Sequence, residues 1–237
     1  MIFSYWEGPK LPYIDLCLRS MAKALGDDFQ LVTPENLDTY LPPGVLHDGW
    51  SRLPQPALRA DCLRAALLAT HGGWWWDADT LAFQKPPEPR GPVVYMTWTR
   101  LPRRVLNGYI YMEKGYPLAL RWLSRINHVL RTNPKSVDWC SLGESVLTHD
   151  VSNDSRALEI SRSLFLPIDI DSNVEEFFTL AKWNLYRGTD TVCFGLNHSY
   201  FVYHHPKAMT IPPDRWKDSP LLVHQLLTYF QERINES

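Results

Sequence analysis

The segment from residue 57 to residue 80 constrains the fold more than any other part of the chain. Residues 57–71 have the pattern of a helix that is apolar on nearly every side, Gly72 and Gly73 interrupt it, and the aromatic run 74–76 follows as a short strand. A helix of this kind has to be covered by protein over most of its surface. The segment therefore predicts a helix and a strand that both lie inside a domain.

Charged residues within this segment indicate a place for chemistry. Arg59, Asp61 and Arg64 lie on the helix. Because an unpaired buried charge is costly, each should pair with another of the three, with backbone groups or with a ligand. Asp77 and Asp79 end the strand, whose period of two would turn both carboxylates to one side. Two hard oxygen ligands on one side suit Mg²⁺ or Mn²⁺.

The rest of the sequence alternates strand and helix patterns, which predicts an α/β sheet flanked by helices in a single domain. Ligands of such sheets bind beyond the carboxyl ends of the strands, where Trp6, Asp77 and Asp79 would project. The expected strands cover residues 2–6, 29–33, 74–77, 92–98, 108–112, 163–166 and 199–204, and the expected helices cover 13–25, 33–40, 57–71, 116–131, a short stretch from 141, and 220–233.

Composition excludes several classes of function. The formal net charge is −2 and no run of Lys and Arg occurs, so the sequence gives no footprint for nucleic acid or for an anionic membrane surface. The four cysteines form no Cys-x-x-Cys pair, and no stretch is long and apolar enough to span a membrane. We therefore expect a cytoplasmic protein. The final helix is amphipathic, and we favour packing on its own domain over peripheral membrane contact.

The spacing of the paired aspartates is not informative by itself, because Asp169 and Asp171 match it equally well. Context separates the two pairs. Asp77 and Asp79 follow a helix, a Gly-Gly break and an aromatic strand, whereas Asp169 and Asp171 lie in a turn-like setting after Pro167. The second pair is interpreted as a solvated turn.

Three motifs together resemble a known family. They are Trp6-Glu-Gly-Pro9, Arg59-Ala-Asp-x-Leu-Arg64, and Gly72-Gly73-x-Trp-x-Asp77-x-Asp79-Thr80. This combination resembles the DXD-motif sugar transferases related to yeast initiating mannosyltransferases and bacterial capsular polysaccharide enzymes, with clostridial glucosylating toxins as more distant relatives. The strong resemblance covers residues 6–83. It implies a GT-A fold, a nucleoside diphosphate sugar donor, a divalent cation, a glycan acceptor and retention of anomeric configuration.

The resemblance also implies roles for individual residues. Trp6 would stack on the base of the nucleotide, and Arg59, Asp61 and Arg64 would bind the nucleotide or the donor sugar. Asp77 would contact ribose or sugar and help to hold Mn²⁺ or Mg²⁺, and Asp79 would ligate the metal directly. Residues 1–83 would then form the nucleotide-binding part, and residues 84–237 the part for the donor sugar and acceptor, with the C-terminal helix.

Beyond these motifs the resemblance is thinner. Asn107 is similar to an asparagine that lines the donor site, with a strand and turn as the structural alternative. Where relatives often have Gly-Pro, this chain has Gly143-Glu144, so Glu144 is a candidate base for an acceptor hydroxyl, although we favour a role in complementing the helix dipole. Relatives also tend to place a histidine near the C-terminus that completes the metal site, and this chain offers His198, His204 and His205. His198 is the first candidate, because it precedes an aromatic stretch expected to be a strand, as the corresponding histidine does in relatives.

Two other functions fit parts of the pattern. A phosphohydrolase of the haloacid dehalogenase type also has an Asp-x-Asp after a buried strand, but its motif requires Thr or Val where this chain has Leu81. A sugar-binding scaffold without activity is the third interpretation. The presence of Arg59 and Asp61 together with Asp77 and Asp79 favours an active transferase.

Overall fold

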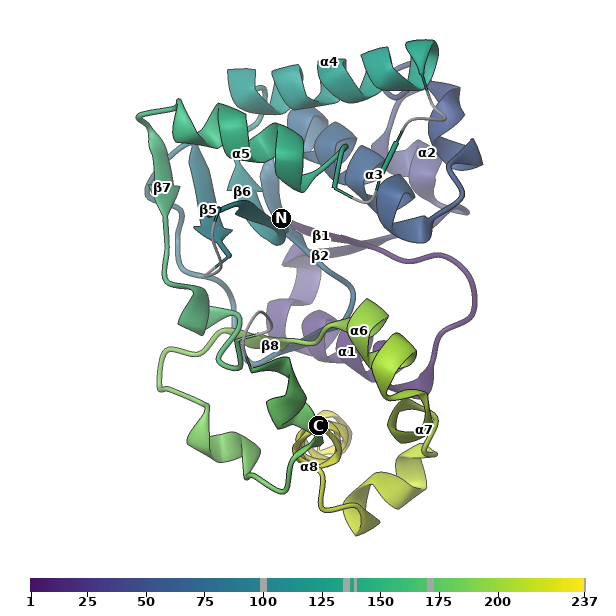
Figure 1. Cartoon of the computed structure of the whole chain (residues 1–237), viewed down its shortest axis with the longest axis vertical. Helices are drawn as coiled ribbons and strands as arrows, with labels where there is room; N and C mark the ends of the chain where they lie inside the picture. The colour runs from purple at the N-terminus through teal and green to yellow at the C-terminus, as the bar shows by residue number, and fades with distance from the viewer. Residues whose placement is uncertain (99–101, 134–136, 139, 170–172, 237) are drawn as a thin grey trace. The chain divides into compact units, whose positions relative to one another are not determined.

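The computed structural model describes residues 1–98, 102–133, 137–138, 140–169 and 173–236 (Figure 1). The chain divides into two compact units. Unit 1 comprises Met1–Glu7, Gln30–Trp76 and Glu88–Ile160, and unit 2 comprises Gly8–Phe29, Asp77–Pro87 and Ser161–Ser237. The single-domain organisation expected from the sequence stays a prediction.

A six-stranded sheet in the order β2-β1-β3-β6-β5-β7 forms the centre of unit 1. Parallel pairing joins β1 to β3 and β5 to β7, while β6 is antiparallel to both β3 and β5. Thus β1, β3, β5 and β7 all run in one direction and β6 in the other. The strands are β1 Ile2–Tyr5, β2 Phe29–Val32, β3 Gly73–Trp76, β5 Val93–Thr97, β6 Val105–Met112 and β7 Ala157–Glu159.

Helices flank this sheet, as the alternating pattern predicted (Figure 1). The helices of unit 1 are α2 Leu37–Tyr40, α3 Pro56–His71, α4 Pro117–Thr132 and α5 Glu144–Ser152, with the 3-10 helix η2 at Asp48–Arg52. Helix α3 packs against α4, β1 and β3. Every residue from Asp61 to Ala69 is buried, so the prediction of a helix covered on nearly all sides is confirmed.

Unit 2 is mainly helical and contains one small antiparallel sheet. That sheet pairs β4 with β8, with Thr80 opposite Gly195 and Ala82 opposite Cys193. Helix α1 packs against β4 and against α8. The elements are α1 Pro12–Leu25, β4 Thr80–Ala82, β8 Cys193–Gly195, α6 His198–His204, α7 Pro206–Met209 and α8 Leu222–Asn235, with 3-10 helices η1 Gly26–Asp28, η4 Arg162–Leu164, η5 Val174–Phe178, η6 Trp183–Leu185 and η7 Pro213–Asp218.

Two expected strands are wrong. Residues 163–166 contain the end of η4 instead of a strand, and residues 199–204 belong to helix α6. The aromatic and β-branched side chains of the second segment favour a strand locally. However, the Asn197 side chain accepts a hydrogen bond from the Tyr200 N–H, and this cap starts a helix. No helix among the described residues is both long and apolar enough to cross a membrane.

The turn between α3 and β3 depends on two glycines with positive φ. Gly72 has φ +69° and Gly73 has φ +105°. A Cβ on Gly72 would lie 2.4 Å from the backbone nitrogen of Lys114, and one on Gly73 would lie 2.6 Å from the Met1 carbonyl oxygen. Only glycine both adopts this conformation without strain and allows the neighbouring backbone to approach.

We expect Gly72→Ala to lower the free energy of unfolding by about 3 kcal/mol or more, as the sum of left-handed strain and steric displacement. Gly115→Ala is the matched control, because Gly115 has φ +70° and no atom within 4 Å of an added Cβ. It should cost only the strain, about 1–2 kcal/mol. Urea unfolding of both variants measures the difference, and equal losses would contradict the close approach at Gly72.

Candidate functional site

The aromatic candidate Trp6 follows the end of β1 in unit 1. Strand β1 is parallel to β3, with Phe3 opposite Trp75, so the carboxyl ends of both strands point the same way. The Trp6 N–H donates to the Val32 carbonyl at 3.1 Å, and its side chain is half-buried. The backbone of Trp6 is therefore fixed at the strand end where the sequence places a ligand.

Next to it, Glu7 and Arg59 form an ion pair that the sequence did not reveal. The Arg59 Nε donates to Glu7 Oε1 at 2.7 Å, and Nη1 of the same guanidinium donates to the Leu53 carbonyl. Both side chains are largely buried, with 16% and 20% exposure. The expectation that Arg59 needs a partner is confirmed. The position of Glu7 directly after Trp6 in the motif was the available signal.

Asp61 is the centre of a buried polar cluster in unit 1. The Arg64 guanidinium donates to Asp61 Oδ1 and lies over the Trp75 ring, 4.7 Å from its centroid. The Asn107 side-chain amide on β6 donates to the same oxygen at 2.9 Å. Asp61 and Arg64 are 6% and 4% exposed, so this ion pair is almost fully removed from water. The structure thus brings three of the predicted residues together.

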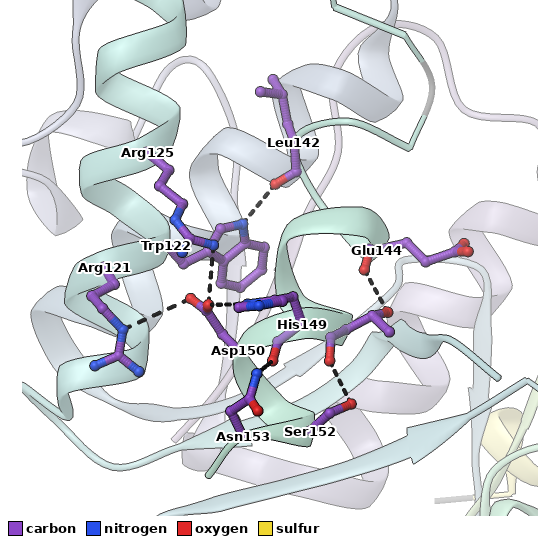
Figure 2. A network of polar contacts seen from close by, with 10 residues as sticks. Arg121, Trp122, Arg125, Leu142, Glu144, His149, Asp150, Ser152 and Asn153 are labelled. Carbon is purple, nitrogen blue, oxygen red and sulfur yellow. Dashed lines mark hydrogen bonds and ion pairs between the residues drawn. The ribbon is translucent and has the colours of Figure 1, made fainter. Parts of the chain in front are cut away.

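Gly143 leaves room for this cluster. A Cβ at Gly143 would lie 2.2 Å from Asn107 Nδ2 and 2.7 Å from Asp61 Oδ2. The neighbouring backbone is anchored to α4, because the Trp122 indole N–H donates to the Leu142 carbonyl at 2.6 Å (Figure 2). In the same view, Arg121 and Arg125 of α4 both form ion pairs with Asp150 and so link α4 to α5. This packing fixes Gly143 beside Asp61.

Glu144 is the first residue of α5, where a carboxylate complements the helix dipole. Its carboxylate also accepts a hydrogen bond from the Trp98 indole N–H at 3.2 Å, and an ion pair of 3.2 Å joins it to Arg104. These contacts agree with the favoured electrostatic interpretation. The alternative role as an acceptor base stays a prediction.

In unit 2, Asp77 and Asp79 lie in the turn before β4 instead of in a strand. The prediction that strand periodicity aligns their carboxylates is therefore wrong. The turn is held by the Thr80 hydroxyl, which donates to the Asp77 carbonyl at 2.5 Å. It is held also by the Asp79 carbonyl, which accepts the Leu196 N–H at 2.9 Å.

His198, the first choice among the late histidines, lies beside Asp79. Its main-chain N–H donates to Asp79 Oδ2 at 2.7 Å, and its Nδ1 is 2.5 Å from the Tyr13 hydroxyl. Burial lowers the pKa of His198, and burial and then the charge of Asp79 raise the pKa of Tyr13. Each shift favours the neutral form of its side chain. His205, by contrast, bonds to Glu175.

Two carboxylates are chemically suitable ligands for Mn²⁺ or Mg²⁺, whereas imidazole is a more usual ligand of zinc, copper, iron and nickel. Among the described residues, however, no three His, Cys, Asp or Glu side chains are gathered in a group able to hold a metal. Mg²⁺ commonly uses one or two protein carboxylates and takes its other ligands from phosphate and water. Asp77 and Asp79 fit that pattern. His198 as a further ligand stays a prediction.

The second aspartate pair differs from the first in its contacts. Asp169 forms a 2.5 Å ion pair with Arg162, and both side chains are mostly buried. Asp169 is thus engaged by a cation and is less solvated than the interpretation as a solvated turn implied. Asp171 lies outside the described residues.

Comparison with known proteins supports the resemblance. Residues 2–89 match the family model of capsular polysaccharide synthesis proteins. The relation to this family is confirmed over that segment, which contains Trp6, Arg59, Asp61, Asp77 and Asp79. The predicted mixed, mainly parallel sheet flanked by helices is also confirmed.

Other comparisons give less. Among solved structures, the chain is similar to one titled "PaToxG Glycosyltransferase", with 16% sequence identity and a TM-score of 0.44. The similarity covers 63% of this chain and 67% of that one. Curated proteins yield no match.

We expect Gly143→Ala to cost about 1–3 kcal/mol of stability, because the new methyl group displaces the Asn107 amide. In an Asn107→Ala background that displacement is absent, so the cost should fall by about 1 kcal/mol. A double-mutant cycle measured by urea unfolding gives this coupling.

The control cycle combines Gly143→Ala with Asn153→Ala in place of Asn107→Ala. Asn153 lies at the opposite end of α5 from Gly143. The nine residues of α5 lie between Asn153 and Gly143, a separation of about 15 Å along the helix, so these two substitutions should be additive. If the stability losses of Gly143→Ala and Asn107→Ala were additive, the close approach of the new methyl group to the Asn107 amide would be contradicted.

Proposed function

We propose that this protein is a glycosyltransferase. It transfers a sugar from a nucleoside diphosphate sugar, UDP- or GDP-linked, to a hydroxyl group of a glycan acceptor in polysaccharide biosynthesis, in the cytoplasm. The family match to residues 2–89 carries the proposal, because the matched segment contains all three N-terminal motifs. The buried Asp61 cluster adds to it, because such charges need a reason to be retained in a core.

In unit 1, Trp6 stacks on the base of the donor and Arg59 and Asp61 bind the nucleotide or sugar. Arg64 is almost completely buried, so it acts by holding Asp61 in place. Asn107 restrains the same carboxylate from β6. A carboxylate with two fixed donors on one oxygen keeps its orientation, which is the preorganisation that a binding site for sugar hydroxyls requires.

In unit 2, Asp77 and Asp79 would hold the divalent cation through their carboxylate oxygens. When bound, the cation acts as a Lewis acid that offsets the charge developing on the departing diphosphate. Asp79 is kept in place by the His198 N–H, and Thr80 fixes the backbone at Asp77. The chain's own task here is to present oxygen ligands.

We further propose retention of the anomeric configuration. The sequence offers no convincing enzyme nucleophile, so attack from the face of the departing diphosphate, whose oxygen accepts the acceptor proton, is the favoured route. Glu144 would be the base for the opposite outcome, but its carboxylate is engaged by Trp98 and Arg104. A carboxylate engaged by these two partners is less available to accept a proton from an acceptor hydroxyl.

The central test is metal-dependent release of nucleoside diphosphate. With Mn²⁺, one UDP- or GDP-sugar should be slowly hydrolysed, and EDTA should abolish the reaction. Asp79→Asn should lower the rate by about 10²-fold or more, because a neutral amide replaces a charged metal ligand. Coupled detection of UDP and GDP across a panel of nucleotide sugars measures this.

Asp169→Asn is the matched control, since it alters the other Asp-x-Asp sequence and should leave the rate unchanged. Hydrolysis of simple phosphomonoesters, with nucleotide sugars inert, would instead support the phosphohydrolase. Absence of binding to any nucleotide sugar would support the interpretation as a scaffold without transferase activity.

Trp6 gives a separate prediction about binding. Trp6→Ala should weaken binding of the free nucleoside diphosphate by about tenfold, because stacking of a base on an aromatic ring contributes about 1–3 kcal/mol. Trp6→Phe keeps an aromatic face and should lose less. Isothermal titration calorimetry with UDP and GDP measures both, and equal affinities for wild type and Trp6→Ala would remove Trp6 from the site.

A further inference from the structure

The carboxylate of Asp79 is held by the main chain of a distant segment within unit 2. The β4–β8 pairing places Thr80 opposite Gly195, and the Leu196 N–H then donates to the Asp79 carbonyl. Two residues further on, the His198 N–H donates to Asp79 Oδ2 at 2.7 Å. The small sheet thus continues directly into a contact with the aspartate side chain.

The N–H group of His198 is suited to this task by its place in α6. His198 is the first residue of the helix, and the first N–H groups of a helix have no partner within it. Asn197 uses its side chain on the N–H of Tyr200, which leaves the N–H of His198 to Asp79. A hydrogen bond from a helix N-terminus to a carboxylate is charge-assisted and stronger than one between neutral groups.

The imidazole of His198 is anchored on the other side by α1. Its Nδ1 lies 2.5 Å from the hydroxyl of Tyr13, and the two ring centroids are 5.9 Å apart. Tyr13 is 1% exposed, and α1 packs against β4. The His198 side chain therefore ties the start of α6 to a rigid part of unit 2, while the main chain of the same residue contacts Asp79.

We propose that His198 is a positioning residue that orients the Asp79 carboxylate through its main-chain N–H, with Tyr13 as its anchor. The consequence for metal binding rests on the proposed function. The contact between His198 and Asp79 does not, because it exists within unit 2 without any ligand.

Two substitutions at one position separate the main chain from the side chain. His198→Ala removes the imidazole and keeps the N–H, whereas His198→Pro removes both. Proline is well tolerated at the first position of a helix. Mn²⁺ affinity, measured by calorimetry without donor, should fall about tenfold or more in His198→Pro, because a hydrogen bond to a charged group is lost.

In His198→Ala and in Tyr13→Phe, which weaken only the anchor, Mn²⁺ affinity should stay within about threefold of wild type. A loss in His198→Ala as large as in His198→Pro would make the imidazole the ligand and overturn the proposal. Wild-type affinity in His198→Pro would overturn it as well. Circular dichroism melting of each variant verifies that it is folded.

Amide hydrogen exchange tests the contact without metal and without a proline. The His198 amide should exchange slowly in the wild-type protein and about tenfold faster in Asp79→Ala, with Asp77→Ala as the control that leaves it slow. Fast exchange in the wild type would overturn the proposal. Slow exchange of the His198 amide in a protein that binds no Mn²⁺ would contradict the proposed metal site and still support the contact between His198 and Asp79.

Discussion

The buried ion pair between Asp61 and Arg64 is the polar centre of unit 1, where α3 meets β3 and β6. Both residues lie on α3, a helix enclosed by protein, so neither charge can be satisfied by water. Removing one partner of such a pair typically costs about 3–5 kcal/mol, because the other charge stays buried. Around this pair, Trp75 of β3 covers the guanidinium and Asn107 of β6 binds the carboxylate. One pair therefore links a helix to two neighbouring strands.

The two units solve the same problem by different means. In unit 1, side chains fix the carboxylate of Asp61, and the chain near α5 makes room with a glycine. In unit 2, the carboxylate of Asp79 is fixed by a main-chain N–H at the start of α6. Side-chain donors are tied to residue identity, whereas a main-chain donor depends on the local fold. The second arrangement therefore leaves no signature in the sequence.

This difference explains how much could be predicted from the sequence. The need of Arg59, Asp61 and Arg64 for partners followed from the cost of buried charge, and the Gly72-Gly73 break followed from glycine conformational freedom. The partners Glu7 and Asn107 are 52 and 46 residues away, so their identity needed the tertiary structure. Residues 199–204 were wrongly predicted as a strand, because their aromatic residues favour a strand and the helix cap at Asn197 was not recognised.

The Asp61 cluster also bears on function, because stability alone does not explain it. A buried ion pair is weak evidence for stability, since well-packed apolar residues of similar volume often stabilise a core equally well or better. Here two donors converge on Oδ1, and glycine is the residue that leaves the space at Oδ2. Close packing of the core does not require an oriented carboxylate with a glycine, Gly143, next to it. Recognition of a polar ligand does require an oriented carboxylate. Asp61 also lies in the segment that matches the family model of capsular polysaccharide synthesis proteins.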